Sequence, residues 1–250
     1  PALRGVAKLI TYGGTLVRSY GTFPHPNVLG AFLVLGLFSL FYFRLKISAD
    51  YKKIFWGIPL GIAIFIIFLG LIITFSRASF LAFGLTMFTG LVYLVITSDK
   101  YWRGALSLIF VILVSGLFAY GIFGNIASSR FKINQDDPSI NLRITYNYIG
   151  LDLIKSHPFL GVGIGNQVLY SSRNKIYENF GLSEPWQKQP IHNLYLLIVS
   201  EIGVLGLLAF LLFLGHIVWQ NLSSGFNLER FIAFLMLFGV LILGLFDHYF

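Results

Sequence analysis

The sequence predicts an all-α integral membrane protein, a polytopic helical bundle with one long external loop that contains an amphipathic helix. Of its 250 residues, 56% are hydrophobic and only 11% are charged, whereas soluble domains carry about 25% charged residues. Such a chain cannot cover a water-facing surface, so the membrane class is favoured. The chain begins with Pro1 and ends inside an apolar run, and we therefore expect it to be a fragment of a larger protein.

Six apolar segments have about the length that crosses the hydrocarbon of a bilayer. They are residues 27–45, 54–74, 78–97, 105–124, 191–219 and 231–250. The predicted organisation follows from them: an external segment (1–26), four transmembrane helices (27–124), an external loop (125–190), and two transmembrane helices (191–250), the last of which we expect to be truncated.

The short loops set the orientation of the helices, because basic residues accumulate on the cytoplasmic side. Loop 44–53 has four Lys or Arg residues, loop 98–104 has two, and loop 220–230 has Arg230. Alternating the spans places all three loops on one side, which we predict to be cytoplasmic. The stretches TFPHPN, TFSRAS and PIHN, together with the long loop 125–190, then lie on the outer face.

Within the long loop, the segment 139–156 is predicted to be an amphipathic helix. Its apolar residues recur at three- and four-residue steps; they are Ile140, Ile144, Tyr148, Leu151 and Ile154. Such a helix suits a position against the membrane or the bundle. His157–Pro158 ends the helix, and the glycine-rich stretch GVGIGN follows without the strand or Lys-Ser/Thr of a nucleotide-binding loop.

Composition excludes several function classes. The formal net charge is +8, but the basic residues do not cluster, so nucleic acid is not an expected partner. There is no cysteine, which excludes disulfides and thiolate metal sites. The histidines show no spacing that is typical of metal ligands, and we expect no metal and no other cofactor.

Two residues on the predicted outer face have side chains suited to chemistry. Arg77 presents a planar guanidinium that matches phosphate oxygens, although an arginine at this depth can also anchor a turn. His192 precedes a span and can accept a proton from a hydroxyl near neutral pH, although it can equally be a polar residue at a helix start.

Other polar residues have a functional and a structural interpretation. Arg143 and Arg18 can bind an anion or lie on a solvated face. His25, between Pro24 and Pro26, suits a loop histidine that bonds the backbone. Glu201 lies about 13–14 Å beyond His192 if the helix is regular, where it would be a structural hydrogen-bond partner or part of an ion relay.

Four stretches of the sequence together resemble the O-antigen ligase and polymerase family of polytopic membrane glycosyltransferases. They are RSYGTFPHPNVLGAFL, TFSRASFLAF, LRITYNYIGLDLIKSHPFLGVGIGNQ and IHNLYLLIVSEIGVLGLL. Their order, and the long loop between the third and fourth, are similar to the core shared by that family, and the resemblance covers nearly the whole chain.

The resemblance implies a function. Such enzymes transfer a glycan from a polyprenyl diphosphate, such as undecaprenyl diphosphate, to an acceptor hydroxyl at the outer face of the bacterial inner membrane, without a metal. It implies that Arg77, Arg143 and His192 are catalytic, the arginines compensating the diphosphate and the histidine activating the acceptor. We expect Arg18, His25 and Asn193 to contact substrate. Direct displacement would invert the anomeric centre.

The partners that the resemblance implies are the lipid-linked glycan donor, an acceptor that is a glycan, a lipid such as lipopolysaccharide core or a protein, and the bilayer itself. The sequence leaves ligase, polymerase and protein oligosaccharyltransferase open as alternatives. A transporter or flippase of lipid-linked glycans is the competing class, with Glu201 in its pathway. Against it, the polar motifs gather at one face instead of the midplane.

Overall fold

The predicted fold class is confirmed by a computed structural model of the chain, which describes residues 7–11, 14–48, 55–97, 99–131 and 138–248. The chain forms two compact units. The first comprises Pro1–Lys132 and Ser224–Leu243, and the second comprises Ile133–Ser223 and Gly244–Phe250. Each unit is described by itself below.

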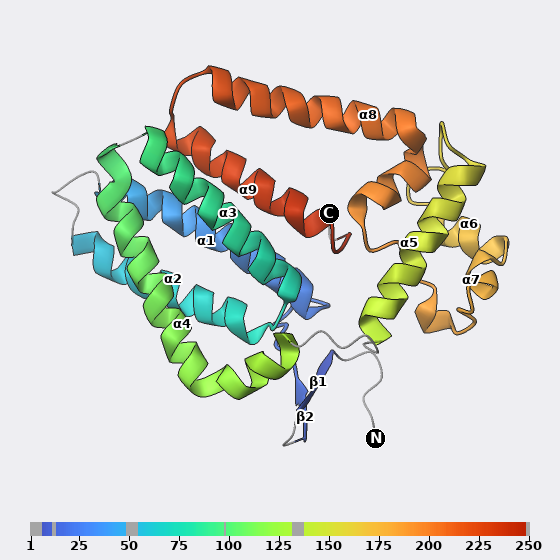
Figure 1. The fold of residues 1–250 in the computed structure, drawn as a ribbon, viewed down its shortest axis with the longest axis horizontal. Coiled ribbons are helices and arrows are strands. Elements are labelled where there is room, and N and C mark those ends of the chain that lie inside the picture. The colour runs from blue at the N-terminus through green and yellow to red at the C-terminus, as the bar shows by residue number, and fades with distance from the viewer. Residues whose placement is uncertain (1–6, 12–13, 49–54, 98, 132–137, 249–250) are drawn as a thin grey trace. The chain divides into compact units, whose positions relative to one another are not determined.

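The first unit is a helical bundle. Its helices are α1 (Pro26–Ser48), α2 (Gly57–Ile73), α3 (Arg77–Thr97), α4 (Trp102–Phe131) and α9 (Leu228–Gly244), with a short 3-10 turn η2 (Asp99–Tyr101) before α4 (Figure 1). Aromatic and branched side chains from these helices form one core, which includes Val34, Phe38, Phe68, Phe83, Phe231 and Leu235. Gly30 lets α1 approach α3 closely, because an added Cβ at this position would collide with Ser79.

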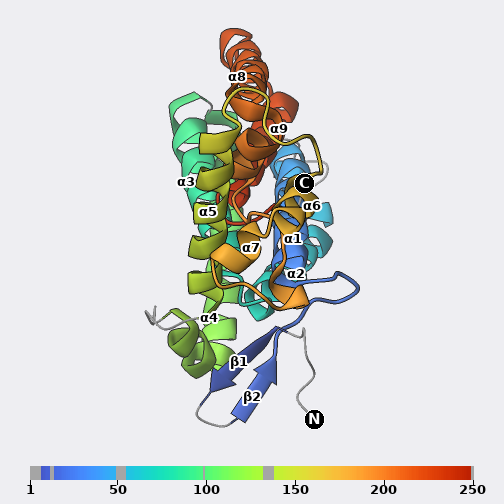
Figure 2. The ribbon, with the colours of Figure 1, turned by 90° about the vertical axis from the view of Figure 1, so that its right-hand side faces the viewer.

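A small antiparallel hairpin precedes the bundle. Strands β1 (Lys8–Thr11) and β2 (Gly14–Val17) pair with Lys8 opposite Val17 (Figure 2). The sequence analysis did not include this hairpin. The paired glycines in TYGGTL are a hairpin signal, but the strands are too short to stand out from the surrounding loop.

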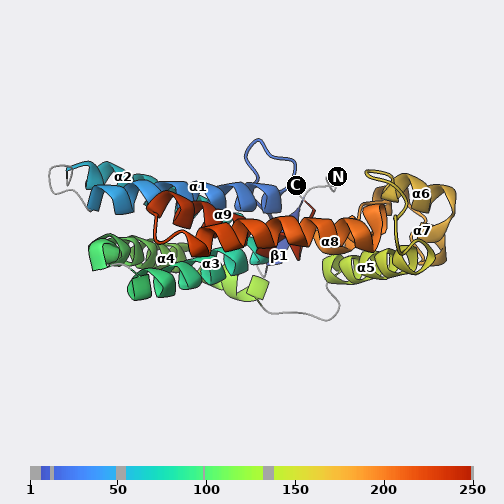
Figure 3. The ribbon, with the colours of Figure 1, turned by 90° about the horizontal axis from the view of Figure 1, so that it is seen from above.

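The second unit is built on α5 (Pro138–Ser156), α6 (Gln167–Arg173), α7 (Ile176–Asn179), a 3-10 turn η3 (Pro185–Gln187) and α8 (Leu194–Ser223), as Figure 3 shows. Its core contains Tyr146, Ile149, Leu153, Tyr177 and Leu182.

The face of α5 that enters this core differs from the predicted apolar stripe. Of the stripe, Ile144, Tyr148 and Leu151 are 47%, 57% and 43% exposed, whereas Tyr146, Ile149 and Leu153 are buried. Helix α5 therefore has apolar residues on two faces. The three- and four-residue spacing of apolar residues could not show which face enters the core.

Within the described residues, four helices are long and apolar enough to cross a membrane. They are α1, α3, α8 and the part of α4 between Trp102 and Ile126, and α2 is a shorter apolar helix. Large apolar side chains on these helices are exposed, including Phe88, Ile96, Leu117 and Leu212. Such exposure would be costly in water, but it is the expected state of a helix surface in lipid. The chain is thus a multi-pass membrane protein.

Helix α8 is bent at Gly203, which has φ 70° and ψ −177°. The chain around Pro158–Gly163 crosses the bend. The Val204 N–H donates to the Pro158 carbonyl at 2.8 Å, and the Val162 N–H donates to the Ser200 carbonyl at 2.9 Å. A Cβ on Gly161 or Gly203 would collide with the opposite backbone. Two glycines therefore permit a backbone-to-backbone crossing that no other residue would allow.

Glu201 precedes the bend and is a structural hydrogen-bond partner. Its Oε2 accepts the Gly165 N–H at 2.9 Å, and its Oε1 accepts the Gln167 N–H at 3.4 Å. The carboxylate thus holds the glycine-rich stretch and the start of α6. The sequence predicted a span over residues 191–219 and left two interpretations of Glu201 open, a structural hydrogen-bond partner or part of an ion relay. The two contacts agree with the structural interpretation, and the bend at Gly203 was not predicted.

Candidate functional site

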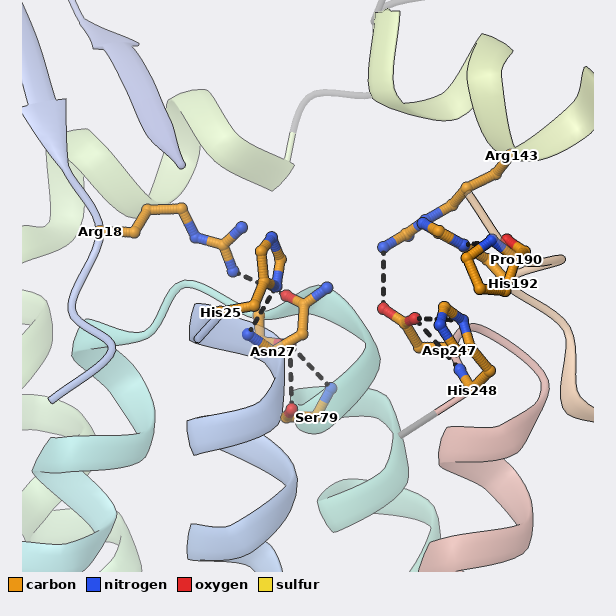
Figure 4. A network of polar contacts seen from close by, with 10 residues as sticks. Arg18, His25, Asn27, Ser79, Arg143, Pro190, His192, Asp247 and His248 are labelled. Atoms are coloured by element: carbon orange, nitrogen blue, oxygen red, sulfur yellow. Dashed lines mark hydrogen bonds and ion pairs between the residues drawn. The ribbon is translucent and has the colours of Figure 1, made fainter. Parts of the chain in front are cut away.

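In the second unit, His192 lies immediately before α8 and packs against two aromatic rings. Its ring centroid is 5.2 Å from that of Tyr146. It is 5.1 Å from that of His248 (Figure 4). Tyr146 is buried, and its hydroxyl donates to the Gln187 carbonyl at 2.7 Å. The His192 imidazole therefore packs against the Tyr146 ring of α5, and a hydrogen bond to the loop before α8 holds this ring in place.

The tautomer of neutral His192 follows from its backbone contact. Nδ1 lies 2.9 Å from the Pro190 carbonyl oxygen. A carbonyl only accepts hydrogen bonds, so Nδ1 carries the proton and donates. The lone pair is then on Nε2, which is the arrangement that a general base requires.

Asp247 joins this group from the segment after α9. Its Oδ2 is 3.5 Å from an Nη atom of Arg143 on α5, and its Oδ1 is 3.4 Å from Nδ1 of His248. Asp247 is only 6% exposed. A buried carboxylate needs a cationic or hydrogen-bonding partner, and the Arg143 guanidinium supplies the charge. We name Arg143, His192, Asp247 and His248 the His192 cluster.

The surroundings of His192 favour its neutral form. Burial lowers the pKa of His192 below its ordinary value, and the nearby Arg143 and His248 side chains lower it further. Asp247 and the Pro190 carbonyl act in the opposite direction and raise the pKa, but desolvation is the largest influence. A base that is neutral near pH 7 is thereby ready to accept a proton.

Asn193 begins α8 and has structural contacts. Its Oδ1 accepts the N–H groups of Tyr195 and Leu196, both at 3.0 Å, and its Nδ2 donates to the Leu245 carbonyl at 3.2 Å. This is a helix N-cap that also ties the segment carrying Asp247 to the segment carrying His192. A contact between Asn193 and substrate stays a prediction.

The His192 cluster contains donor types that a metal ion could use. One ligand atom each from His192, Asp247 and His248 lies within 4.8 Å of the others. The Arg143 guanidinium beside Asp247 would, however, repel a dication. The chemistry of the set therefore favours an ion pair over a metal centre.

In the first unit, Arg18 is a buried arginine that donates hydrogen bonds to Thr74 and Asn27. Its Nε donates to the Thr74 carbonyl at 2.8 Å, and its Nη2 donates to Asn27 Oδ1 at 2.9 Å (Figure 4). His25 accepts the Asn27 N–H on Nδ1 at 3.2 Å. Arg18 thus connects the start of α1 to the end of α2.

Arg77 is the first residue of α3, directly after a tight turn. Phe75 in this turn has a left-handed conformation, with φ 48°. Ser76 caps α3, because its hydroxyl accepts the Ser79 N–H at 3.4 Å, and Thr74 is the residue that Arg18 holds. The position of Arg77 is therefore set by a strained and heavily bonded turn.

The structure brings two of the three predicted catalytic residues into one cluster. Arg143 and His192 both belong to the second unit, whereas Arg77, Arg18 and His25 belong to the first. Asp247 and His248 were not predicted to be site residues. In the sequence they are an aspartate and a histidine at the end of an apolar run. This pattern alone does not predict which residues they contact.

A comparison with protein families gives a match to the model of the O-antigen ligase family over residues 62–211. This is more than half of the chain. The chain belongs to the O-antigen ligase family. None of the curated proteins compared with the chain matches it.

Membership of the O-antigen ligase family confirms the resemblance carried by the four sequence stretches. It supports an O-antigen ligase-like transfer of glycans in a multi-pass membrane protein. The matched range includes Arg77, Arg143 and His192, and it ends before Asp247.

Proposed function

We propose that the protein transfers a glycan from a polyprenyl diphosphate to an acceptor hydroxyl, with His192 as the general base. The observation that carries the proposal is the His192 cluster. A histidine with its lone pair on Nε2 lies beside a buried carboxylate that is paired to an arginine. A base and an anion-binding group are the two requirements of a displacement that expels a diphosphate.

The proposed step is a single displacement at the anomeric carbon. The acceptor oxygen forms a bond to that carbon, and the bond from the carbon to the diphosphate oxygen breaks. The electron pair leaves with the polyprenyl diphosphate, and the hydroxyl proton moves to Nε2 of His192. One displacement inverts the anomeric configuration, and retention observed by NMR in the product would contradict this step.

Arg143 is proposed to stabilise the charge that develops on the departing diphosphate. A guanidinium has five N–H donors, so Arg143, whose Nη2 lies 3.5 Å from Asp247 Oδ2, can also donate to phosphate oxygens. Pairs of this kind are strong because both groups are charged. Arg77 is proposed to bind the same diphosphate, and Arg18, His25 and Asn193 are proposed to contact substrate at the outer face of the inner membrane.

Transfer by purified protein tests this function directly. A synthetic polyprenyl-diphosphate oligosaccharide is incubated with the protein and with glycan, lipid or peptide acceptors, and the products are sized. We expect an acceptor-linked glycan and free polyprenyl diphosphate in equal amounts, also in the presence of a chelator. A ladder of products would indicate a polymerase, and a single addition would indicate a ligase.

The contacts of Glu201 weigh against the competing transporter function. Glu201 was the acidic residue expected deep in a span, and it binds the backbone amides of Gly165 and Gln167 instead. Movement of the lipid-linked glycan across a vesicle without formation of a new glycosidic bond would nevertheless favour the transporter.

A further inference from the structure

A second site lies in the first unit, at the end of α1 that is opposite to Arg18 and Asn27. A pocket of about 410 Å³ is lined there by α1, η2 and the start of α9. Its polar residues are Tyr42, Lys46, Lys100, Tyr101, Asn227 and Glu229. Helix α1 has 23 residues, or roughly 34 Å at 1.5 Å per residue, which is about the thickness of the hydrocarbon. The pocket therefore lies at the other membrane surface.

The pocket carries a net positive charge. Lys46 donates to the Tyr42 hydroxyl at 2.7 Å, this hydroxyl donates to Glu229 at 2.8 Å, and Lys46 lies 3.9 Å from Glu229. One lysine thus offsets the glutamate. Lys100 adds a second positive charge, and its Nζ lies 5.6 Å from the centre of the Tyr101 ring. Two positive charges and one negative charge complement an anion.

An apolar groove adjoins the pocket. It has a volume of about 370 Å³ and runs between α1 and α9, where Phe43, Ile232, Ala233 and Met236 line it. Tyr42 and Glu229 line both the pocket and the groove, so the polar and apolar spaces meet at these two side chains. A ligand that fills both has a charged end and a hydrocarbon tail.

We infer that this site binds a phospholipid with a net negative headgroup. Its phosphate lies between Lys46 and Lys100, and one acyl chain follows the groove along α9. The chemistry agrees with basic pockets between transmembrane helices, which recognise anionic headgroups at the cytoplasmic face. The basic loops predict this same face to be cytoplasmic. None of the residues that line the site is among those that we propose for glycan transfer.

Lipid binding by the purified chain tests the inference. Phosphatidylglycerol, phosphatidylethanolamine and phosphatidylcholine with identical acyl chains are titrated separately, and bound lipid is counted by native mass spectrometry. We expect phosphatidylglycerol to bind about tenfold more tightly than the other two, which corresponds to about 1.4 kcal/mol. Equal binding of the three lipids, or a preference for phosphatidylethanolamine, would overturn the proposal.

Two pairs of substitutions locate the headgroup. Lys46→Gln with Lys100→Gln should reduce the affinity for phosphatidylglycerol to that for phosphatidylcholine. Lys155→Gln with Lys175→Gln removes the same charge outside the pocket and should leave the preference intact. Lys100→Gln alone changes only an exposed side chain and should lower the preference partly, so a folding defect in the double variant does not decide the result. An unchanged preference in the Lys46 and Lys100 variants would contradict the assignment.

A third substitution locates the tail. Ala233 is exposed in the groove, and Ala233→Trp should fill it without displacing a core side chain. We expect all three lipids to bind more weakly while the order of their affinities is kept. Unchanged affinity in this variant would remove the groove from the site.

Discussion

At the scale of single residues, the proposed chemistry depends on the protonation of His192. The Pro190 carbonyl fixes the proton on Nδ1, and burial lowers the pKa. A general base works only in its neutral form, and the neutral fraction grows as the pH rises through the pKa. Activity should therefore fall on the acidic side, with a midpoint below the ordinary histidine value of about 6.5.

Replacing Asp247 tests the electrostatics of this arrangement. The Asp247 carboxylate raises the pKa of His192, so Asp247→Asn should lower it and move the acidic limb of the pH–rate profile to lower pH. The total rate should also fall, because Arg143 loses its partner. Asp152→Asn, a change at an acidic residue of α5 outside the His192 cluster, serves as the control and should leave the profile in place. A shift of the limb to higher pH in Asp247→Asn would contradict the account.

Glu201 distinguishes a structural carboxylate from a proton relay. Glu201→Gln keeps an oxygen that can accept the Gly165 N–H, whereas Glu201→Ala removes both acceptors. A hydrogen bond to a charged group contributes about 1.5–3 kcal/mol. We expect Glu201→Gln to keep most of the activity and thermal stability, and Glu201→Ala to lose much of both. Complete inactivation by Glu201→Gln with unchanged stability would support a relay.

The residue scale also shows what sequence reasoning can reach. The candidates His192, Arg143 and Arg77 could be chosen from the sequence because each lies in one of the stretches that resemble the family. Asp247 could not, since its importance comes from Arg143, more than a hundred positions earlier in the chain. Long-range ion pairs of this kind depend on tertiary packing. A local sequence pattern does not predict them.

At the scale of elements, the crossing of α8 by the glycine-rich stretch is the feature most sensitive to substitution. Gly203 has a backbone conformation that is nearly restricted to glycine and costs other residues about 1–3 kcal/mol. Gly203→Ala also introduces a collision with the Phe159 carbonyl. The melting temperature in detergent should therefore fall by several degrees, and transfer activity should fall with it.

Gly215 provides the matched control in the same helix. An added Cβ at Gly215 meets no atom within 4 Å, and alanine has the higher helix propensity. Gly215→Ala should leave the melting temperature unchanged or raise it slightly. Equal destabilisation by both substitutions would show that the crossing has no special role.

The helices themselves were largely predictable. Apolar runs of about 20 residues can satisfy their backbone hydrogen bonds in lipid only as helices, and α1, α3, α4 and α8 lie where these runs lie. The bend in α8 was not predictable, because its glycine is ordinary in an apolar sequence and its partner segment lies about 40 residues away.

At the scale of the whole molecule, the predicted topology can be measured on the native sequence. The chain has no cysteine. A single introduced cysteine is therefore the only thiol that a maleimide can label, and its labelling reports the accessibility of that position. Ser183 and Ser223 are exposed and lie on either side of the α8 span. Ser183→Cys should react with a membrane-impermeant maleimide from the outer side, and Ser223→Cys should react only after the membrane is opened. The reverse pattern would invert the topology and place His192 in the cytoplasm.

The most direct test of the central claim compares donor binding with transfer in His192→Ala. A positioned general base contributes about 10²–10⁴-fold to a rate. Purified His192→Ala should therefore bind the polyprenyl-diphosphate glycan with the affinity of the wild type and transfer it at least about 100-fold more slowly. His216→Ala, which changes an exposed histidine of α8, should remain active. Transfer by His192→Ala at the wild-type rate would contradict the assignment of His192 as the catalytic base.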